Sequence, residues 1–230
     1  MLKGLILKDI YSIRVQLILA FLLTLLPNIM LMLAGGGMAV SDGDFLSHEE
    51  ATLVSVCIYG IINYITVTVF SSLLLNTLDG DAASGWAKMQ RTMPVSGTQI
   101  IGGKIIATLL IIGWLTVVSL IFNLLGVLIF EMPFEVMAAL PVCCGLLQIV
   151  TLCPVFPLSM KLGIKYSTAI YIGMVVIIAA GMLVLLVSVM SSDISETTLR
   201  ISMYGALPVL AAAVLGISFA AGKRACETDM

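Results

Sequence analysis

The sequence is poor in charge, since only 10% of its 230 residues are Asp, Glu, Lys or Arg and it holds a single histidine. Soluble domains carry about 25% charged residues, so this chain lacks the polar side chains that would cover a water-exposed surface. Hydrophobic residues make up 60% of the chain, and its mean hydropathy is +1.17. We therefore expect an integral membrane protein that contacts lipid and has no nucleic-acid partner.

Metal-ligand patterns are also scarce. None of the five cysteines forms a C-x-x-C pair, so the spacing of a structural zinc site is missing. Four of the five lie in apolar runs and are interpreted as buried hydrophobic residues. The one histidine, His48, stands in the acidic stretch SDGDFLSHEE, which could bind a metal. We favour the alternative that Ser47 and Glu50 form a capping box that begins a helix.

Complete nucleotide motifs are absent as well. The stretch GTQIIGGKI resembles a P-loop, but Thr98 replaces its first glycine and Ile105 replaces the hydroxyl residue that would hold magnesium. The stretch DGDAAS begins like the signature of enzymes that transfer phosphoalcohol groups from CDP-linked lipids, but Ser84 replaces its arginine. No ionisable residue lies well inside an apolar run, which argues against proton or sodium coupling. We expect no catalytic residue, cofactor or metal in this chain.

The chain does contain apolar blocks long enough to cross a ~30 Å hydrocarbon layer. Lipid offers no hydrogen-bond partner to the backbone, so each block must be helical, and the alternation of a β-barrel strand is absent. The sequence predicts an all-α membrane protein in which residues 1–230 form a single transmembrane domain. The six predicted spans are about 15–35, 53–75, 105–130, 136–159, 167–190 and 201–221.

Basic residues give the predicted orientation. If the six spans alternate, ten of the eleven Lys and Arg residues fall on one side and only Arg200 falls on the other. The positive-inside rule then places both termini in the cytoplasm. A cleaved signal peptide ending near 33–37 is the disfavoured alternative, because the first apolar run is long for one.

Two amphipathic segments flank the first spans. Residues 1–13 are predicted to form a short helix that either lies in the membrane interface or simply extends span one. The polar loop 79–104, DGDAASGWAKMQRTMPVSGTQIIGGK, contains Trp86, Met89 and Met93 at helical spacing, with Pro94 ending that helix. Its helix either rests among lipid headgroups or docks onto a protein. Ser96 and Gln99 then form a capping box that begins a helix over 97–130.

A family resemblance accompanies these features. The basic opening MLKGLILKDIYSIR, the loop 79–104 and the six-span plan resemble the permease subunits of bacterial type-2 ABC exporters. The likeness is to the compact six-span branch associated with export of amphipathic, phenol-soluble-modulin-like peptides. The loop departs from that branch at Ala82 and Ala83, where an acidic residue or a lysine is frequent.

The resemblance implies a division of labour. A separate cytoplasmic ATPase subunit would bind ATP and Mg²⁺, and two permease chains, identical or sister, would form the pathway in the bacterial cytoplasmic membrane. The cargo would be an apolar or amphipathic peptide, toxin or drug-like molecule. Four loop residues are the predicted ATPase contacts: Trp86, Lys88, Met89 and Arg91.

Mid-span polar residues are the candidates for the pathway. They either line a substrate cavity or hydrogen-bond neighbouring helices for modest stability. The candidates are Tyr59, Asn63, Thr66, Asn123 and Gln148. Two other functions stay open: a membrane enzyme of lipid-headgroup transfer, and a peptide-binding immunity or scaffold protein that does not pump.

Overall fold

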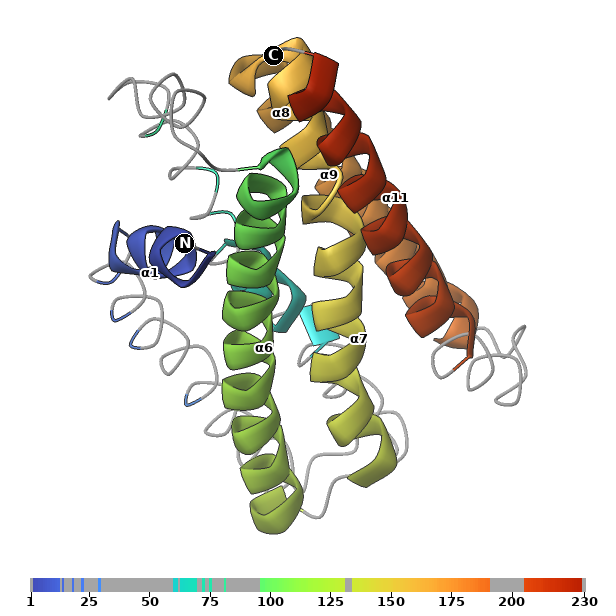
Figure 1. Cartoon of the computed structure of the whole chain (residues 1–230). Helices are drawn as coiled ribbons and strands as arrows, with labels where there is room; N and C mark the ends of the chain where they lie inside the picture. Colours follow the sequence, from blue (N-terminus) through green and yellow to red (C-terminus); the bar gives the residue numbers. More distant parts are fainter. Residues whose placement is uncertain are drawn as a thin grey trace.

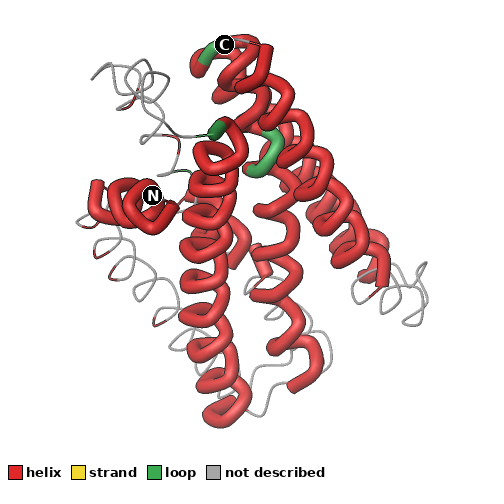
Figure 2. The backbone as a smooth tube through the Cα atoms, in the orientation of Figure 1, coloured by secondary structure: helices red, strands yellow, loops and turns green. Residues whose placement is uncertain are grey.

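The described part of the chain is built from helices. The computed structural model describes residues 2–12, 14, 18, 22, 29, 60, 61, 63–69, 72, 75, 81, 96–130, 134–190 and 205–228. Within these residues the backbone is helical apart from short turns and contains no strand (Figure 2). The all-α prediction is confirmed for these ranges.

Within the described residues, four helical stretches are long and apolar enough to cross a membrane, and one of them comprises both α7 and α8. The helices are α1 (Leu2–Ser12), α6 (Gly97–Phe130), α7 (Phe134–Leu152), α8 (Val155–Leu162), α9 (Ile164–Met190) and α11 (Leu207–Thr228). The candidate spans are Thr98–Leu128, Met137–Leu162, Ile164–Gly181 and Leu207–Ala225. They correspond to the last four spans predicted from the sequence. The first two predicted spans lie largely outside the described residues, so the count of six stays a prediction.

Helix α6 is the long axis of the bundle and agrees with its prediction at both ends. The Gln99 amide donates to the Ser96 backbone carbonyl at 2.9 Å and to the Ser96 hydroxyl at 3.4 Å. This is the N-cap half of the predicted capping box. At 1.5 Å per residue the helix is about 50 Å long, so it exceeds the thickness of the hydrocarbon layer.

The fourth predicted span is divided into α7 and α8 at a proline. The regular backbone is interrupted between Leu152 and Val155, where Pro154 lacks the amide proton that would continue α7, and Pro157 follows in the first turn of α8. Gly163 ends α8 with φ of 83°, a conformation that favours glycine because it has no Cβ. The chain therefore turns sharply at Gly163 and returns as α9.

The helices pack as an antiparallel bundle with α1 lying across α6 (Figure 1). Helix α7 runs beside α6, and α11 packs against α6, α7 and α8. The start of α6, the α8–α9 corner and the end of α11 gather at one end of the bundle, at the top of Figure 1. That end carries the described basic residues of these helices: Lys104, Lys161, Lys165, Lys223 and Arg224.

The core lies where α6, α7, α8 and α9 meet the helical residues 63–69. Val67, Ile111, Leu152 and Tyr171 belong to one buried cluster there. Outward-facing apolar side chains are abundant on the same helices, including Trp114 (55% exposed) and Ile177 (72% exposed). A water-facing surface of this kind would be unfavourable by about 25 cal/mol per Å², so we interpret these faces as lipid- or partner-facing.

Close packing of α11 on α6 gives a first prediction. A Cβ at Gly222 would lie 2.9 Å from Ile101 Cδ1 and 3.0 Å from its Cγ2, and Ile101 is fully buried. We expect Gly222→Ala to lower stability by about 1–3 kcal/mol through overpacking. Thermal unfolding in detergent measures this. Gly216→Ala is the matched control, since nothing lies within 4 Å of its Cβ and a helical alanine favours folding. Equal melting temperatures of Gly222→Ala and Gly216→Ala would contradict this packing.

Candidate functional site

Four charged side chains from three parts of the chain meet at the side of α6. We call Lys8, Asp9, Asp81 and Lys104 the charge cluster. Lys104 Nζ lies 3.0 Å from Asp9 Oδ1 and 2.7 Å from Asp81 Oδ2. Lys8 Nζ lies 3.5 Å from Asp9 Oδ1 and also pairs with Asp81. Each ammonium group therefore contacts both carboxylates, and the four formal charges sum to zero.

The cluster is largely withdrawn from water. The side chains of Asp9, Lys104 and Asp81 are 4%, 7% and 10% exposed, while that of Lys8 is 32% exposed. Buried charges are costly unless they are paired and hydrogen-bonded. The alternating arrangement meets that requirement, because each buried carboxylate lies between two cations.

The cluster joins segments that are distant in sequence. Helix α1 supplies Lys8 and Asp9, and α6 supplies Lys104. Asp81 lies near the start of the loop 79–104 and Lys104 is its last residue, so their ion pair connects the two ends of that loop. Any force applied to the loop would therefore act on α6 and, through Asp9, on α1.

Helix α1 places its carboxylate against α6. Asp9 is buried towards α6, while Leu7 and Tyr11 are 64% and 63% exposed. The Arg14 guanidinium lies over the Tyr11 ring at 4.1 Å from its centroid, a cation–π contact. The prediction of a helix over 1–13 is confirmed within one residue at each end, and it lies across α6.

The charge cluster was not predicted from the sequence. Lys104 directly precedes the predicted span 105–130, and no partner was predicted for it. Lys8, Asp9 and Asp81 were visible as charges beside apolar blocks, but their separations of 73 and 95 residues from their partners give no local signal. Only the packing of α1 and of Asp81 against α6 reveals that these residues meet.

A second polar group lies deeper in the bundle, between helices. Asn63 donates to Asn123 Oδ1 at 3.2 Å, and Asn123 donates to the Met137 carbonyl at 2.9 Å. Gln148 donates to the Thr68 hydroxyl. These bonds connect residues 63–69 to α6 and α7.

Tyr171 of α9 extends the same network. Its hydroxyl donates to the Thr68 carbonyl at 3.2 Å and lies 3.5 Å from Gln148 Oε1. Asn63, Asn123 and Gln148 are fully buried, and Thr66 is 6% exposed. Within this chain the amides link helices, which was the sequence-based alternative to a cavity; whether they also line a pathway stays a prediction. Thr68 and Tyr171 were not predicted.

Several predicted residues lie outside the described residues. These are Tyr59, Trp86, Lys88, Met89, Arg91 and His48. Among the described residues no group of three or more His, Cys, Asp or Glu side chains is arranged to hold a metal ion. Cys144 and Cys153 are buried free thiols, as predicted for hydrophobic positions, whereas Cys143 is only partly buried.

Comparison with known proteins gives one match. A family model described as "ABC-2 family transporter protein" matches residues 48–221. No match was found among curated proteins or solved structures. The matched range contains Asp81, Lys104 and the amide network, whereas Lys8 and Asp9 precede it.

Proposed function

The chain belongs to the ABC-2 family of transporter proteins. We propose that a separate ATPase binds the loop 79–104 and that its ATP hydrolysis powers transport through this chain. Membership in this family makes the chain a multi-pass permease subunit, a membrane component that is generally not catalytic. The permease therefore requires a partner that hydrolyses ATP and holds Mg²⁺. In this proposal Trp86 and Met89 fill an apolar groove on the ATPase, and Lys88 and Arg91 contact its rim.

The observation that carries the proposal is the ion pair between Asp81 and Lys104. It attaches Asp81, near the start of the loop, to Lys104 of α6 at 2.7 Å, and buried ion pairs are screened by salt much less than exposed ones. When the ATPase displaces a loop held in this way, α6 moves with it. A loop that merely rested among headgroups would not need such an attachment.

The remaining features follow from the same proposal. Six spans with both termini in the cytoplasm place the loop on the side where ATP is available, and the described basic residues of α6, α8, α9 and α11 share one end of the bundle. Two permease chains, identical or sister, would enclose the pathway in a bacterial plasma membrane. The outward apolar faces, which include Trp114 and Ile177, suit an apolar or amphipathic cargo such as an exported peptide.

Purification with the partner tests the proposal. We expect the tagged full-length chain, extracted from its own cells in mild detergent, to retain a P-loop ATPase whose ATP hydrolysis rises on reconstitution with the chain. The ATPase alone and the ATPase with an unrelated six-span protein are the controls. A chain that turns over lipid headgroups with added metal and no ATPase would instead be a membrane enzyme. A chain that binds peptide with no effect on any ATPase would be a scaffold or immunity protein.

A further inference from the structure

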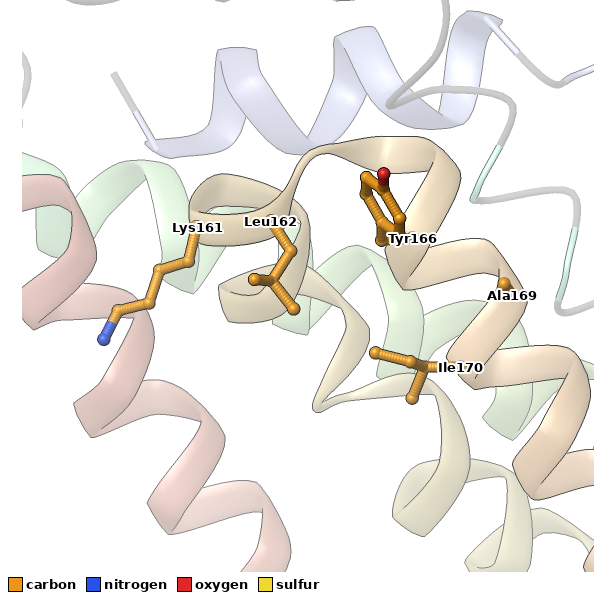
Figure 3. Close-up of a pocket in the computed structure, with 5 residues that line it drawn as sticks. All are labelled: Lys161, Leu162, Tyr166, Ala169 and Ile170. Carbon is orange, nitrogen blue, oxygen red and sulfur yellow. The ribbon is translucent and has the colours of Figure 1, made fainter.

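The corner between α8 and α9 holds a groove outside the charge cluster and the amide network. Its volume is about 610 Å³, and its lining residues are Lys161, Leu162, Tyr166, Ala169 and Ile170. The turn at Gly163 brings the end of α8 beside the first turns of α9. Figure 3 shows Leu162, Tyr166, Ala169 and Ile170 around this corner, while the Lys161 side chain extends from the end of α8 away from Tyr166.

The lining combines one cation with an apolar wall. Leu162 is 51% exposed and Ile170 is 38% exposed, although both are apolar. Tyr166 is 71% exposed, as an aromatic ring at a membrane–water boundary often is. In the described part of the chain no carboxylate lines the groove or pairs with Lys161. The groove therefore suits a molecule with an anionic end and an apolar body.

The surroundings indicate where the apolar body would go. Below the groove, α9 continues with exposed apolar side chains, including Ile172 (55%), Val176 (60%) and Ile177 (72%). Only 11% of the α9 span is buried within the chain. An acyl chain that entered beside Ile170 could lie along this face, while its headgroup stays at the bundle end that carries Lys161 and Lys165.

We propose that the α8–α9 groove binds an anionic phospholipid, with its phosphate on Lys161 and its acyl chains on Leu162 and Ile170. Basic pockets beside membrane helices take anionic headgroups, and each nearby lysine contributes about fivefold to binding. A free inorganic anion would leave the apolar wall exposed, so the lipid is the better complement. This inference does not depend on the ATPase and can fail or succeed without it.

Native mass spectrometry of the purified full-length chain with phosphatidylglycerol tests the inference. We expect bound phosphatidylglycerol in preference to phosphatidylcholine, and about fivefold weaker binding in Lys161→Ala. Ile170→Ala should also weaken binding, because it removes part of the apolar wall. Lys223→Ala, a charge-matched change at the same end of the bundle, should bind like the wild type. Variants are compared only after they elute as folded protein.

Three outcomes would overturn the inference. The first is binding of phosphatidylglycerol that is unchanged in both Lys161→Ala and Ile170→Ala. The second is full displacement of the lipid by inorganic phosphate, which would make the groove a simple anion site. The third is an efficient disulfide between two chains that carry Leu162→Cys in lipid bilayers, which would mean that a second copy covers the groove.

Discussion

Replacing Lys104 with alanine should destabilise the bundle by about 3–5 kcal/mol, because it leaves two buried carboxylates with one partly exposed cation. Asp9 and Asp81 are 4% and 10% exposed, so neither can recover the lost interaction from water. Chemical or thermal unfolding in detergent measures the loss. Because the cluster is buried, added salt should change the difference little. The exposed Lys165→Ala is the matched control and should stay within about 0.5 kcal/mol of the wild type.

A double variant that neutralises one ion pair distinguishes the cost of an unpaired buried charge from the cost of lost packing. The double variant Lys104→Met with Asp81→Asn removes one positive and one negative charge and leaves Lys8 beside Asp9. We expect it to be more stable than Lys104→Met alone, with a coupling energy of about 0.5–3 kcal/mol. Additive effects of the two substitutions would mean that these side chains do not interact in the folded chain.

Replacing both Trp86 and Met89 with alanine should strongly reduce ATP-driven transport while the permease stays inserted and folded. Tryptophan is a frequent hot-spot residue, and losing one costs about 2 kcal/mol or more of binding, roughly thirtyfold in affinity. This prediction rests on the proposed ATPase partner. Stimulation of ATP hydrolysis by the reconstituted permease measures it.

The other tryptophan of the chain supplies the matched control for this variant. Trp114 lies on the outward face of α6 and is 55% exposed, so Trp114→Ala should leave the stimulation of ATP hydrolysis unchanged. Normal ATP-driven export in the double variant would disprove the loop contact. Labelling of a Trp86→Cys variant from outside intact cells would disprove the cytoplasmic position of the loop as well.

The charge-cluster variants and the loop variants test two different steps: transmission of movement from the loop to the helices, and contact of the loop with the ATPase. Charge-cluster variants should weaken the attachment of the loop to α6 and α1, so they lower stability and coupling together. Loop variants at 86 and 89 should lower coupling alone. If Lys104→Ala lost stability but still coupled ATP hydrolysis fully to transport, the charge cluster would stabilise the fold without transmitting movement from the loop.

Much of the fold could be predicted from the sequence because the bilayer enforces it. An apolar block of about 20 residues has to be a helix in lipid, and the four described spans agree with their predictions. The ends of α6 were predictable from local chemistry, since Ser96 and Gln99 signal a start and the apolar run extends to Phe130. Loop residues Trp86 to Arg91 stay predictions, because they lie outside the described residues.

Other features needed the assembled bundle. A proline inside an apolar run signals a kink but not its size. Pro141 stays within α7 and Pro157 lies in the first turn of α8, whereas Pro154 lies between these two helices. Similarly, Gly222 and Gly216 are both helical glycines, and only the position of Ile101 separates a tight contact from an open one.

The sequence alone therefore determined what the solvent imposes: a membrane protein, helices of spanning length, their caps and the bias of basic residues. These follow from local composition, since hydrophobic transfer and backbone hydrogen bonding act on contiguous residues. The tertiary structure alone decided which charges meet. Lys104 meets Asp9 because α1 crosses α6, and it meets Asp81 because that residue also packs beside α6. The attraction between opposite charges depends on their distance in space, which the distance along the chain does not give.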